Sequence, residues 1–273
     1  MYVKTGDHMN KPKIILSTSL KGGVGKSTVA ANVAYQLSLY GYRVLLCDLD
    51  FDVRSLDLIM GYENSVLFDI CDVLSGRRQY NDAKITDKRS ENLFFLGAPY
   101  EFSDSFTSDE FAQKLRQLAK DEGLDYVILD TAGADTFALE CALKASDEAM
   151  VIASHTPASL RGAQKSARMC EDANVSPRLI VNNFDYSAVV DGKRAGMIDI
   201  IDSAKVSLLG VVPYDVKLVY AQERGILASN DGFVSHRAFK NIAQRIVSEK
   251  TGERYVPILK GVKKIKRKKV LTV

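Results

Sequence analysis

The stretch S-L-K-G-G-V-G-K-S-T, residues 19–28, decides the fold of this chain. It follows an apolar run that ends at Ser17 and opens a helical pattern that begins at Ser27. A strand, a glycine-rich loop and a helix in this order bind phosphate, because backbone N–H groups and the helix N-terminus together attract an anion. Glycines permit torsions and a close approach that a Cβ atom would prevent. We therefore expect a loop that binds the phosphates of a nucleotide.

The side chains of this loop have separate expected roles. Lys26 should reach the β- and γ-phosphates, the Ser27 hydroxyl should bind Mg²⁺, and Thr28 is placed to donate to the α-phosphate. The loop residues expected to bind nucleotide are Gly22, Gly23, Val24, Gly25, Lys26, Ser27 and Thr28. The usual pattern G-x-x-x-x-G-K-[ST] is not met, because Leu20 stands at its first glycine position, and Lys21 adds a second lysine. A glycine-rich hairpin with two surface lysines is the alternative.

Aspartates follow two further apolar runs, at the point where each expected strand ends. Asp48, Asp50 and Asp52 follow one run, and Asp130 follows the other. Carboxylates at such strand ends orient the attacking water or bind Mg²⁺, directly or through a water molecule. The alternative for the first three is a solvated acidic loop, and the alternative for Asp130 is a cap on the following turn.

Apolar runs alternate with helical patterns along the chain. Strands are expected at Ile14–Ser17, Val44–Cys47, Leu93–Leu96, Tyr126–Leu129, Ala149–Ala153, Leu179–Val181 and Leu208–Val212. Helices are expected at Ser27–Tyr40, Asp109–Glu122, Thr136–Ala145, Ser159–Asp172 and Val234–Glu249, with helix stops at Gly41, Gly76 and Gly123. Several runs are continuous rather than alternating, as in strands buried on both faces. The pattern predicts an α/β fold with a single doubly wound, mostly parallel sheet and helices on both faces.

Composition limits the class of protein. Of the 273 residues, 46% are hydrophobic and 26% are charged, which is ordinary for a soluble globular protein. No run approaches the ~18–20 apolar residues of a membrane span, and Met1–Lys13 lacks the apolar segment of a signal peptide, so we expect a cytoplasmic location. The four cysteines, Cys47, Cys71, Cys141 and Cys170, form no C-x-x-C pair. Reduced, mostly buried thiols are therefore expected, without a zinc or iron–sulfur site.

The end of the chain is strongly basic, whereas the rest of the chain is mildly acidic. Val256–Val273 carries seven lysines and arginines and no acid; the whole chain carries +3, so residues 1–255 carry −4. Four apolar side chains between Ile258 and Ile265 would share one face of a helix, with lysines around it. We therefore divide the chain into a flexible leader (1–12), a nucleotide-binding domain (13–253) and a basic tail (254–273) that meets an anionic surface. A tail that is merely solvated, or that touches nucleic acid, is the alternative.

These motifs resemble those of a known family. K-G-G-V-G-K-S-T with its additional lysine is similar to the deviant phosphate loop of the MinD/ParA ATPases. D-L-D-F-D-V-R-S-L-D-L-I-M-G at 48–61 resembles the switch I and following helix of the MinD branch, and L-G-V-V-P-Y-D at 209–215 is also similar to that branch. The resemblance covers most of the chain.

The resemblance implies roles for particular residues. Lys21 would be the signature lysine that reaches the phosphates of a partner subunit, so the competent form would be a homodimer with ATP sandwiched between its subunits. Asp50 would activate the water, Asp48 would lie near the metal and Asp130 would be the Walker B aspartate. Two further positions would bind the base: Asn182 would read adenine, and Pro213 would flank it. The alternative for Asn182 is a turn former.

The implied function is that of an ATPase with ATP/ADP and Mg²⁺, slow until dimerisation and a protein activator complete its site. A MinD-like member would cycle between cytoplasm and the inner face of the membrane, held there in the ATP state by two tails acting together, and would act in spatial regulation such as division-site placement. A ParA-type DNA-partitioning ATPase, whose dimer binds DNA through lysines and arginines, and a flagellar or pilus placement regulator are the alternatives. The missing C-x-x-C argues against an iron–sulfur carrier, and no second substrate motif favours a small-molecule ligase or kinase.

Overall fold

The computed structural model describes residues 11–51, 53–99, 106–133, 136–229 and 232–251. The basic tail, all but the last two residues of the leader and Asp52 lie outside these ranges. The predictions made for them are therefore not addressed by the fold described below.

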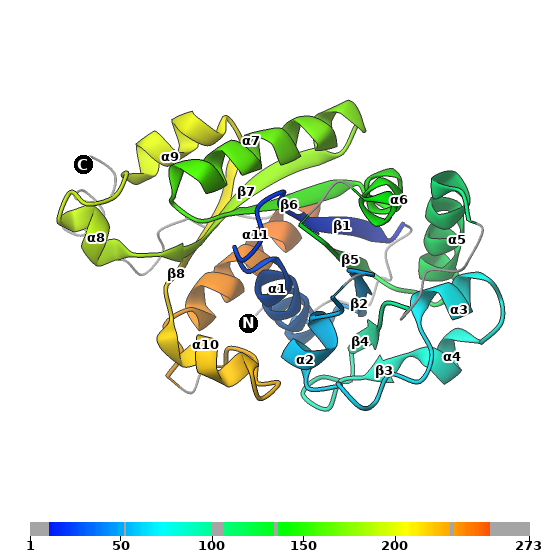
Figure 1. Ribbon diagram of the computed structural model, residues 1–273. Helices are drawn as coiled ribbons and strands as arrows, with labels where there is room; N and C mark the ends of the chain where they lie inside the picture. Colours follow the sequence, from blue (N-terminus) through cyan, green and yellow to red (C-terminus); the bar gives the residue numbers. More distant parts are fainter. Residues whose placement is uncertain (1–10, 52, 100–105, 134–135, 230–231, 252–273) are drawn as a thin grey trace.

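An eight-stranded sheet runs through the molecule in the order β3-β4-β2-β5-β1-β6-β7-β8 (Figure 1). The strands are β1 (Lys13–Thr18), β2 (Val44–Leu49), β3 (Ile85–Thr86), β4 (Leu93–Leu96), β5 (Tyr126–Thr131), β6 (Glu148–Ala153), β7 (Ser176–Phe184) and β8 (Leu208–Pro213). Only β3 is antiparallel to its neighbour. β1 lies in the middle between β5 and β6, so the loop that follows β1 emerges at the centre of the carboxyl edge.

Helices cover both faces of the sheet. They are α1 (Lys26–Leu39), α2 (Leu56–Met60), α3 (Ile70–Leu74), α4 (Tyr80–Ala83), α5 (Ser108–Asp121), α6 (Phe137–Ala145), α7 (Pro157–Asp172), α8 (Tyr186–Val190), α9 (Met197–Ala204), α10 (Val216–Gln222) and α11 (His236–Thr251). The long helices α1 and α11 pack together on one side of the sheet, whereas α7 and α9 lie on the other (Figure 1). The α/β class, the single mostly parallel sheet and the two helical layers are confirmed.

The core follows from the apolar runs. Successive side chains of β1 point to opposite faces: Ile15 packs in the core under α1, and Ile14 and Leu16 pack in the core under α6. All three are at most 1% exposed, because helices cover both faces of the central strand. All four cysteines are free and buried, as predicted.

Every predicted strand and helix is found, with ends that differ by a few residues. Gly41, Gly76 and Gly123 take a positive φ directly after α1, α3 and α5, as expected of helix stops. The predicted ranges omitted β3 and the short helices α2, α3, α4, α8, α9 and α10, although the resemblance of residues 48–61 implied a helix at α2. Each of these spans eight residues or fewer, which is too short for an apolar period to emerge from the sequence. Within the described residues, no helix combines the length and apolar character needed to cross a bilayer.

Candidate nucleotide site

The phosphate loop joins β1 to α1, as predicted, at the carboxyl edge of the sheet. Gly25 is the N-cap residue of α1 and takes the left-handed conformation, with φ 88°, and no side chain caps the first turn of the helix. The N–H groups of that turn are therefore left for an anion, and the helix dipole favours negative charge there. Lys26, Ser27 and Thr28 form that first turn and are half-buried, whereas Lys21, Gly22 and Gly23 are exposed. The alternative of a hairpin with surface lysines is wrong.

Asn182 lies directly against this loop. It belongs to β7, is 4% exposed, and its Nδ2 donates to the Val24 carbonyl at 2.8 Å. The alternative of a turn former is therefore wrong. Pro213 ends the neighbouring strand β8 and pairs in register with Phe184 of β7. Both residues expected at the base thus come to the same edge of the sheet as the loop, although their contact with adenine stays a prediction.

The close fit between Asn182 and the loop leads to a test. A Cβ atom on Gly25 would lie 2.4 Å from Asn182 Nδ2, in a backbone conformation of φ +88° that side chains rarely adopt. We expect Gly25→Ala to lower the free energy of unfolding by about 2 kcal/mol or more and to weaken nucleotide binding. Gly76→Ala is the matched control, because its φ of +79° carries the same strain but nothing lies within 4 Å. Equal losses in the two variants, measured by urea denaturation, would contradict the steric argument.

Two buried carboxylates stand side by side next to the loop. Asp48 on β2 pairs in register with Asp130 on β5, and each is 1% exposed. Asp48 accepts the backbone N–H groups of Asp50 at 2.8 Å and Leu56 at 3.3 Å. Asp130 lies inside a strand and caps nothing, and its Oδ1 has no hydrogen-bond partner. The alternatives of a solvated loop for Asp48 and a turn cap for Asp130 are therefore wrong.

The environment opposes negative charge on this pair. Burial raises the pKa of Asp130 to about 7, although a hydrogen bond with Ser27 and the charge of Lys26 act in the opposite direction. Burial and then the charge of Asp130 raise the pKa of Asp48. Groups perturbed in this way cluster at functional sites, because a cation that binds there restores the favourable charge balance.

These residues fit Mg²⁺. The ion prefers oxygen ligands and uses one or two carboxylates together with hydroxyl, water and phosphate oxygens. The unpartnered Asp130 oxygen, the neighbouring Asp48 carboxylate and the Ser27 hydroxyl supply such a set. The described residues contain no cluster of three acidic, histidine or cysteine side chains.

The other predicted residues surround the same point. A Cβ atom on Gly133 would lie 3.4 Å from Lys26 Nζ and 3.5 Å from Gly22, so the segment after β5 touches the loop. Asp50 follows β2 and is half-buried, and one of its oxygens accepts the N–H of Val53 at 3.0 Å. The fold therefore brings Lys26, Asp48, Asp50 and Asp130 together, with Lys21 on the exposed side of the loop.

Three residues of the site were missed from the sequence. Ser55 Oγ lies 3.4 Å from Ser27 Oγ, and Ser17 on β1 donates its hydroxyl to the Lys26 carbonyl at 3.4 Å and lowers the pKa of Asp130. Gln222 of α10 accepts the Thr28 hydroxyl at 2.7 Å. The position of Ser17 at the end of the first strand is a signal that could have found it. Nothing in the sequence around Gln222 indicates a contact with a residue 194 positions away.

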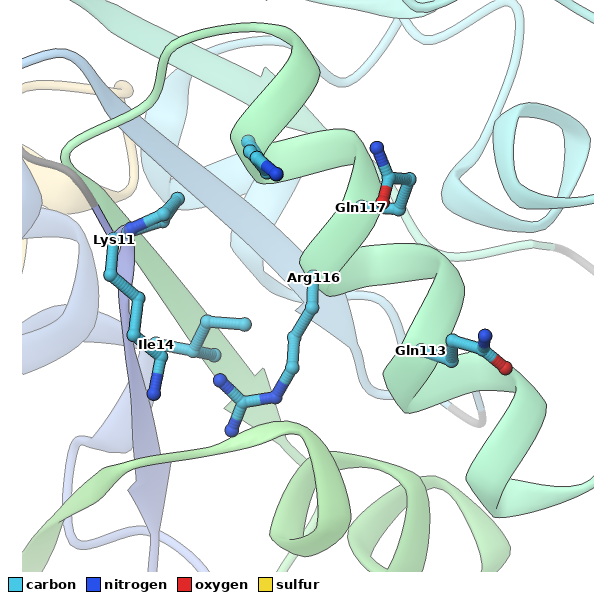
Figure 2. Close-up of a pocket in the computed structure, with 7 residues that line it drawn as sticks. Lys11, Ile14, Gln113, Arg116 and Gln117 are labelled. Atoms are coloured by element: carbon cyan, nitrogen blue, oxygen red, sulfur yellow. The ribbon is translucent and has the colours of Figure 1, made fainter.

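A cavity elsewhere on the molecule is not part of this site. It has a volume of about 460 Å³ and lies between the start of β1 and α5, where Figure 2 shows Arg116 extending from the helix toward Lys11 and Ile14. The phosphate loop follows the opposite end of β1. The cavity therefore opens at the amino edge of the sheet, away from the carboxyl edge where ligands of such folds bind.

Similarity to known proteins agrees with this geometry. The family model described as "CobQ/CobB/MinD/ParA nucleotide binding domain" matches residues 15–228. The chain belongs to this family. It is 33% identical over 256 residues to the septum site-determining protein MinD of Neisseria meningitidis, covering 89% of this chain and 94% of that protein. It is also 33% identical over 239 residues to MinD of Bacillus subtilis, covering 86% and 89%.

Solved structures give the same result. A chain of the MinC:MinD cell division protein complex of Aquifex aeolicus superposes with a TM-score of 0.79 at 30% identity, covering 89% of this chain and 96% of that one. MinD with Mg-ADP from Pyrococcus horikoshii superposes with a TM-score of 0.76 at 24% identity, covering 88% and 98%, and shows the shared fold. The MinD/ParA family and the resemblance to its MinD branch are both confirmed, and the chain is a MinD-like nucleotide-binding ATPase.

Proposed function

We propose that this MinD-like protein hydrolyses ATP as a dimer and uses the nucleotide state to control its association with an anionic membrane surface, in the service of septum-site placement. The observation that carries the chemistry is the buried Asp48–Asp130 pair beside an uncapped helix N-terminus and Lys26. The septum site-determining relatives support the cellular role, and the MinC:MinD complex supports a protein partner for this chain.

The chemistry is an in-line attack of water on the γ-phosphate. The loop N–H groups and Lys26 bind the phosphates and stabilise the charge that develops on them. Ser27 and the two buried aspartates would hold Mg²⁺, and the ion would neutralise phosphate charge. Asp50 orients the water, and Asn182 and Pro213 bind the base at the same edge of the sheet.

Slow basal turnover has a physical reason in this arrangement. One Asp50 oxygen accepts the N–H of Val53 at 3.0 Å, and a rearrangement of the turn after β2 would free this oxygen for the attacking water. Dimerisation and a protein activator would supply that rearrangement. Lys21, exposed on the outer side of the loop, would then reach the phosphates of the partner subunit.

The role of Lys21 can be tested directly. We expect Lys21→Ala to retain MgADP binding but to lose the ATP-dependent dimer, measured by light scattering, and to slow single-turnover hydrolysis about 100-fold. The control is Lys120→Ala, an exposed lysine on α5, which should dimerise and hydrolyse as the unchanged protein does. Unchanged dimerisation and hydrolysis in Lys21→Ala would overturn the proposed role.

The target of the dimer is tested by co-sedimentation with anionic liposomes. The full chain should sediment with ATP and not with ADP, and deletion of residues 256–273 should abolish sedimentation while leaving ATP-dependent dimerisation intact. ATP-dependent binding to DNA without binding to liposomes would replace the membrane proposal by a DNA-partitioning role. Binding to neither would leave a protein target.

A further inference from the structure

Arg89, in the connection between β3 and β4, joins three segments that are far apart in the sequence. Its guanidinium donates to the carbonyl of Gly225 at 2.8 Å and to the carbonyl of Met60 at 3.0 Å. The same group forms an ion pair with Asp87. Met60 ends α2 and Gly225 follows α10, so one side chain ties the ends of two helices to each other.

The ion pair that holds Arg89 is itself fixed. The Asp87 side chain is fully buried, and the Tyr62 hydroxyl donates to it at 2.5 Å. Burial alone would raise the pKa of Asp87, but the hydrogen bonds from Arg89 and Tyr62 outweigh burial and lower it. Asp87 is therefore ionised at neutral pH, and the guanidinium is held in one orientation by a bidentate contact.

The two helix ends also touch through their backbones. A Cβ atom on Gly225 would lie 2.4 Å from the Cα of Gly61, and both glycines have a positive φ. Only two glycines permit this approach. The contact leaves little freedom for α10 to move relative to α2.

Both tied helices reach the nucleotide site. At the start of α2, the Leu56 N–H donates to Asp48 and Ser55 Oγ lies 3.4 Å from Ser27 Oγ. At the end of α10, Gln222 accepts the Thr28 hydroxyl at 2.7 Å. The N–H of Gly225 donates to the Gln222 carbonyl at 3.1 Å, so these two residues form one turn and move together.

We propose that Gln222 is a positioning residue for nucleotide binding, which orients the Thr28 hydroxyl toward the α-phosphate, and that Arg89 holds Gln222 in place by fastening α10 to α2. The proposal rests on the expected role of Thr28 as a ligand of the α-phosphate.

The chemistry of the amide explains how Gln222 acts. While its carbonyl oxygen accepts the Thr28 proton, as in this structure, that hydroxyl cannot donate to a phosphate. If the amide turns over, its NH₂ group donates to Thr28 Oγ1, and the Thr28 proton is directed to the phosphate. An amide can make both bonds at the same position, whereas a carboxylate can only accept.

The test measures MgADP affinity by calorimetry in five variants of the full chain. Gln222→Leu and Arg89→Lys should each weaken binding about five-fold, the usual effect of one hydrogen bond. Gln222→Glu should weaken it further, because it accepts the proton and adds charge beside the phosphates. The double variant Arg89→Lys/Gln222→Leu should bind MgADP no more weakly than the single variant with the lower affinity, because the effects of residues that act through one contact do not add. Thr28→Val reports on the expected role of Thr28.

Several outcomes would overturn the proposal. If Thr28→Val weakens binding but Gln222→Leu does not, the role of Gln222 is wrong and that of Thr28 stands. If the effects of Arg89→Lys and Gln222→Leu multiply, Arg89 does not act through Gln222. If Thr28→Val binds as tightly as the unchanged protein, the assignment of Thr28 fails and the proposal fails with it.

A purely structural role of Arg89 is separated by a control. Arg178→Lys alters another part-buried arginine, whose ion pair with Glu148 joins β7 to β6, on the other side of the central strand β1 from Arg89 and β4. It should lower the melting temperature without changing MgADP affinity. A lower melting temperature with unchanged MgADP affinity in Arg89→Lys would show that Arg89 only stabilises the fold. If Arg89→Lys does not fold, Gln222→Leu and Gln222→Glu decide the role of Gln222 on their own.

Discussion

The Lys26→Ala variant is expected to lose at least 100-fold in ATP turnover, because Lys26 lies in the first turn of α1 and is the lysine expected to reach the β- and γ-phosphates. Its Nζ lies against Gly133, and its charge lowers the pKa of the buried Asp130. Removing it takes away a donor to the transferring phosphate, which costs about 10²- to 10³-fold at sites of this kind. It also removes a charge that favours the ionised form of Asp130, so the pKa of Asp130 should rise further in the same variant.

The measurement is steady-state phosphate release at saturating MgATP, together with nucleotide affinity. Lys144→Ala is the matched control, because that lysine forms an exposed ion pair with Asp109 on the surface. Such pairs contribute about 0–1 kcal/mol, so its turnover should not change. Turnover in Lys26→Ala within a few-fold of the unchanged protein would contradict the assignment of the site.

The Asp130→Asn variant is expected to become more stable while it loses Mg²⁺-dependent hydrolysis. Its carboxylate is 1% exposed, has an unpartnered oxygen and neighbours Asp48, and these features oppose its ionised form. A neutral amide of the same shape removes that unfavourable charge. We expect the free energy of unfolding of the nucleotide-free protein to rise by about 1–3 kcal/mol at pH 8.

The pH dependence has a definite sign. The pKa of Asp130 is raised from 3.8 to about 7, so in this window the folded state binds more protons than the unfolded state. Stability contributed by the protonated group is therefore lost as pH rises through about 7. Asp130→Asn should remove this pH-dependent loss from the free energy of unfolding, measured by urea denaturation between pH 4 and pH 8.

Asp125, at the other end of β5, provides the contrast. It is also 1% exposed, but its Oδ2 accepts the backbone N–H of Arg43 at 2.9 Å. Asp125→Asn should therefore lower stability and leave nucleotide chemistry unchanged. A loss of stability in both variants would show that Asp130 serves the fold rather than the site.

The sequence predicted the strands and helices whose apolar residues form a clear run or a clear helical period. β1, β2 and β5 are continuous apolar runs, and α1 and α11 are long enough for a helical period to show. The glycines of the loop were identified because their spacing reflects a backbone requirement. The short α3, α4, α8, α9 and α10 gave no such signal, and neither did the two-residue strand β3.

The amino-acid sequence by itself therefore determined the α/β class, the phosphate loop and the presence of aspartates at strand ends. Each of these features depends on residues that lie within a few positions of one another. Only the tertiary structure decided which strand lies beside which, and with it the pairing of Asp48 with Asp130 and the contact of Asn182 with Val24. It likewise decided that Gln222 meets Thr28 and that Arg89 joins α2 to α10. These contacts join residues from 29 to 194 positions apart, and burial and packing of the whole sheet, rather than local pattern, bring such residues together.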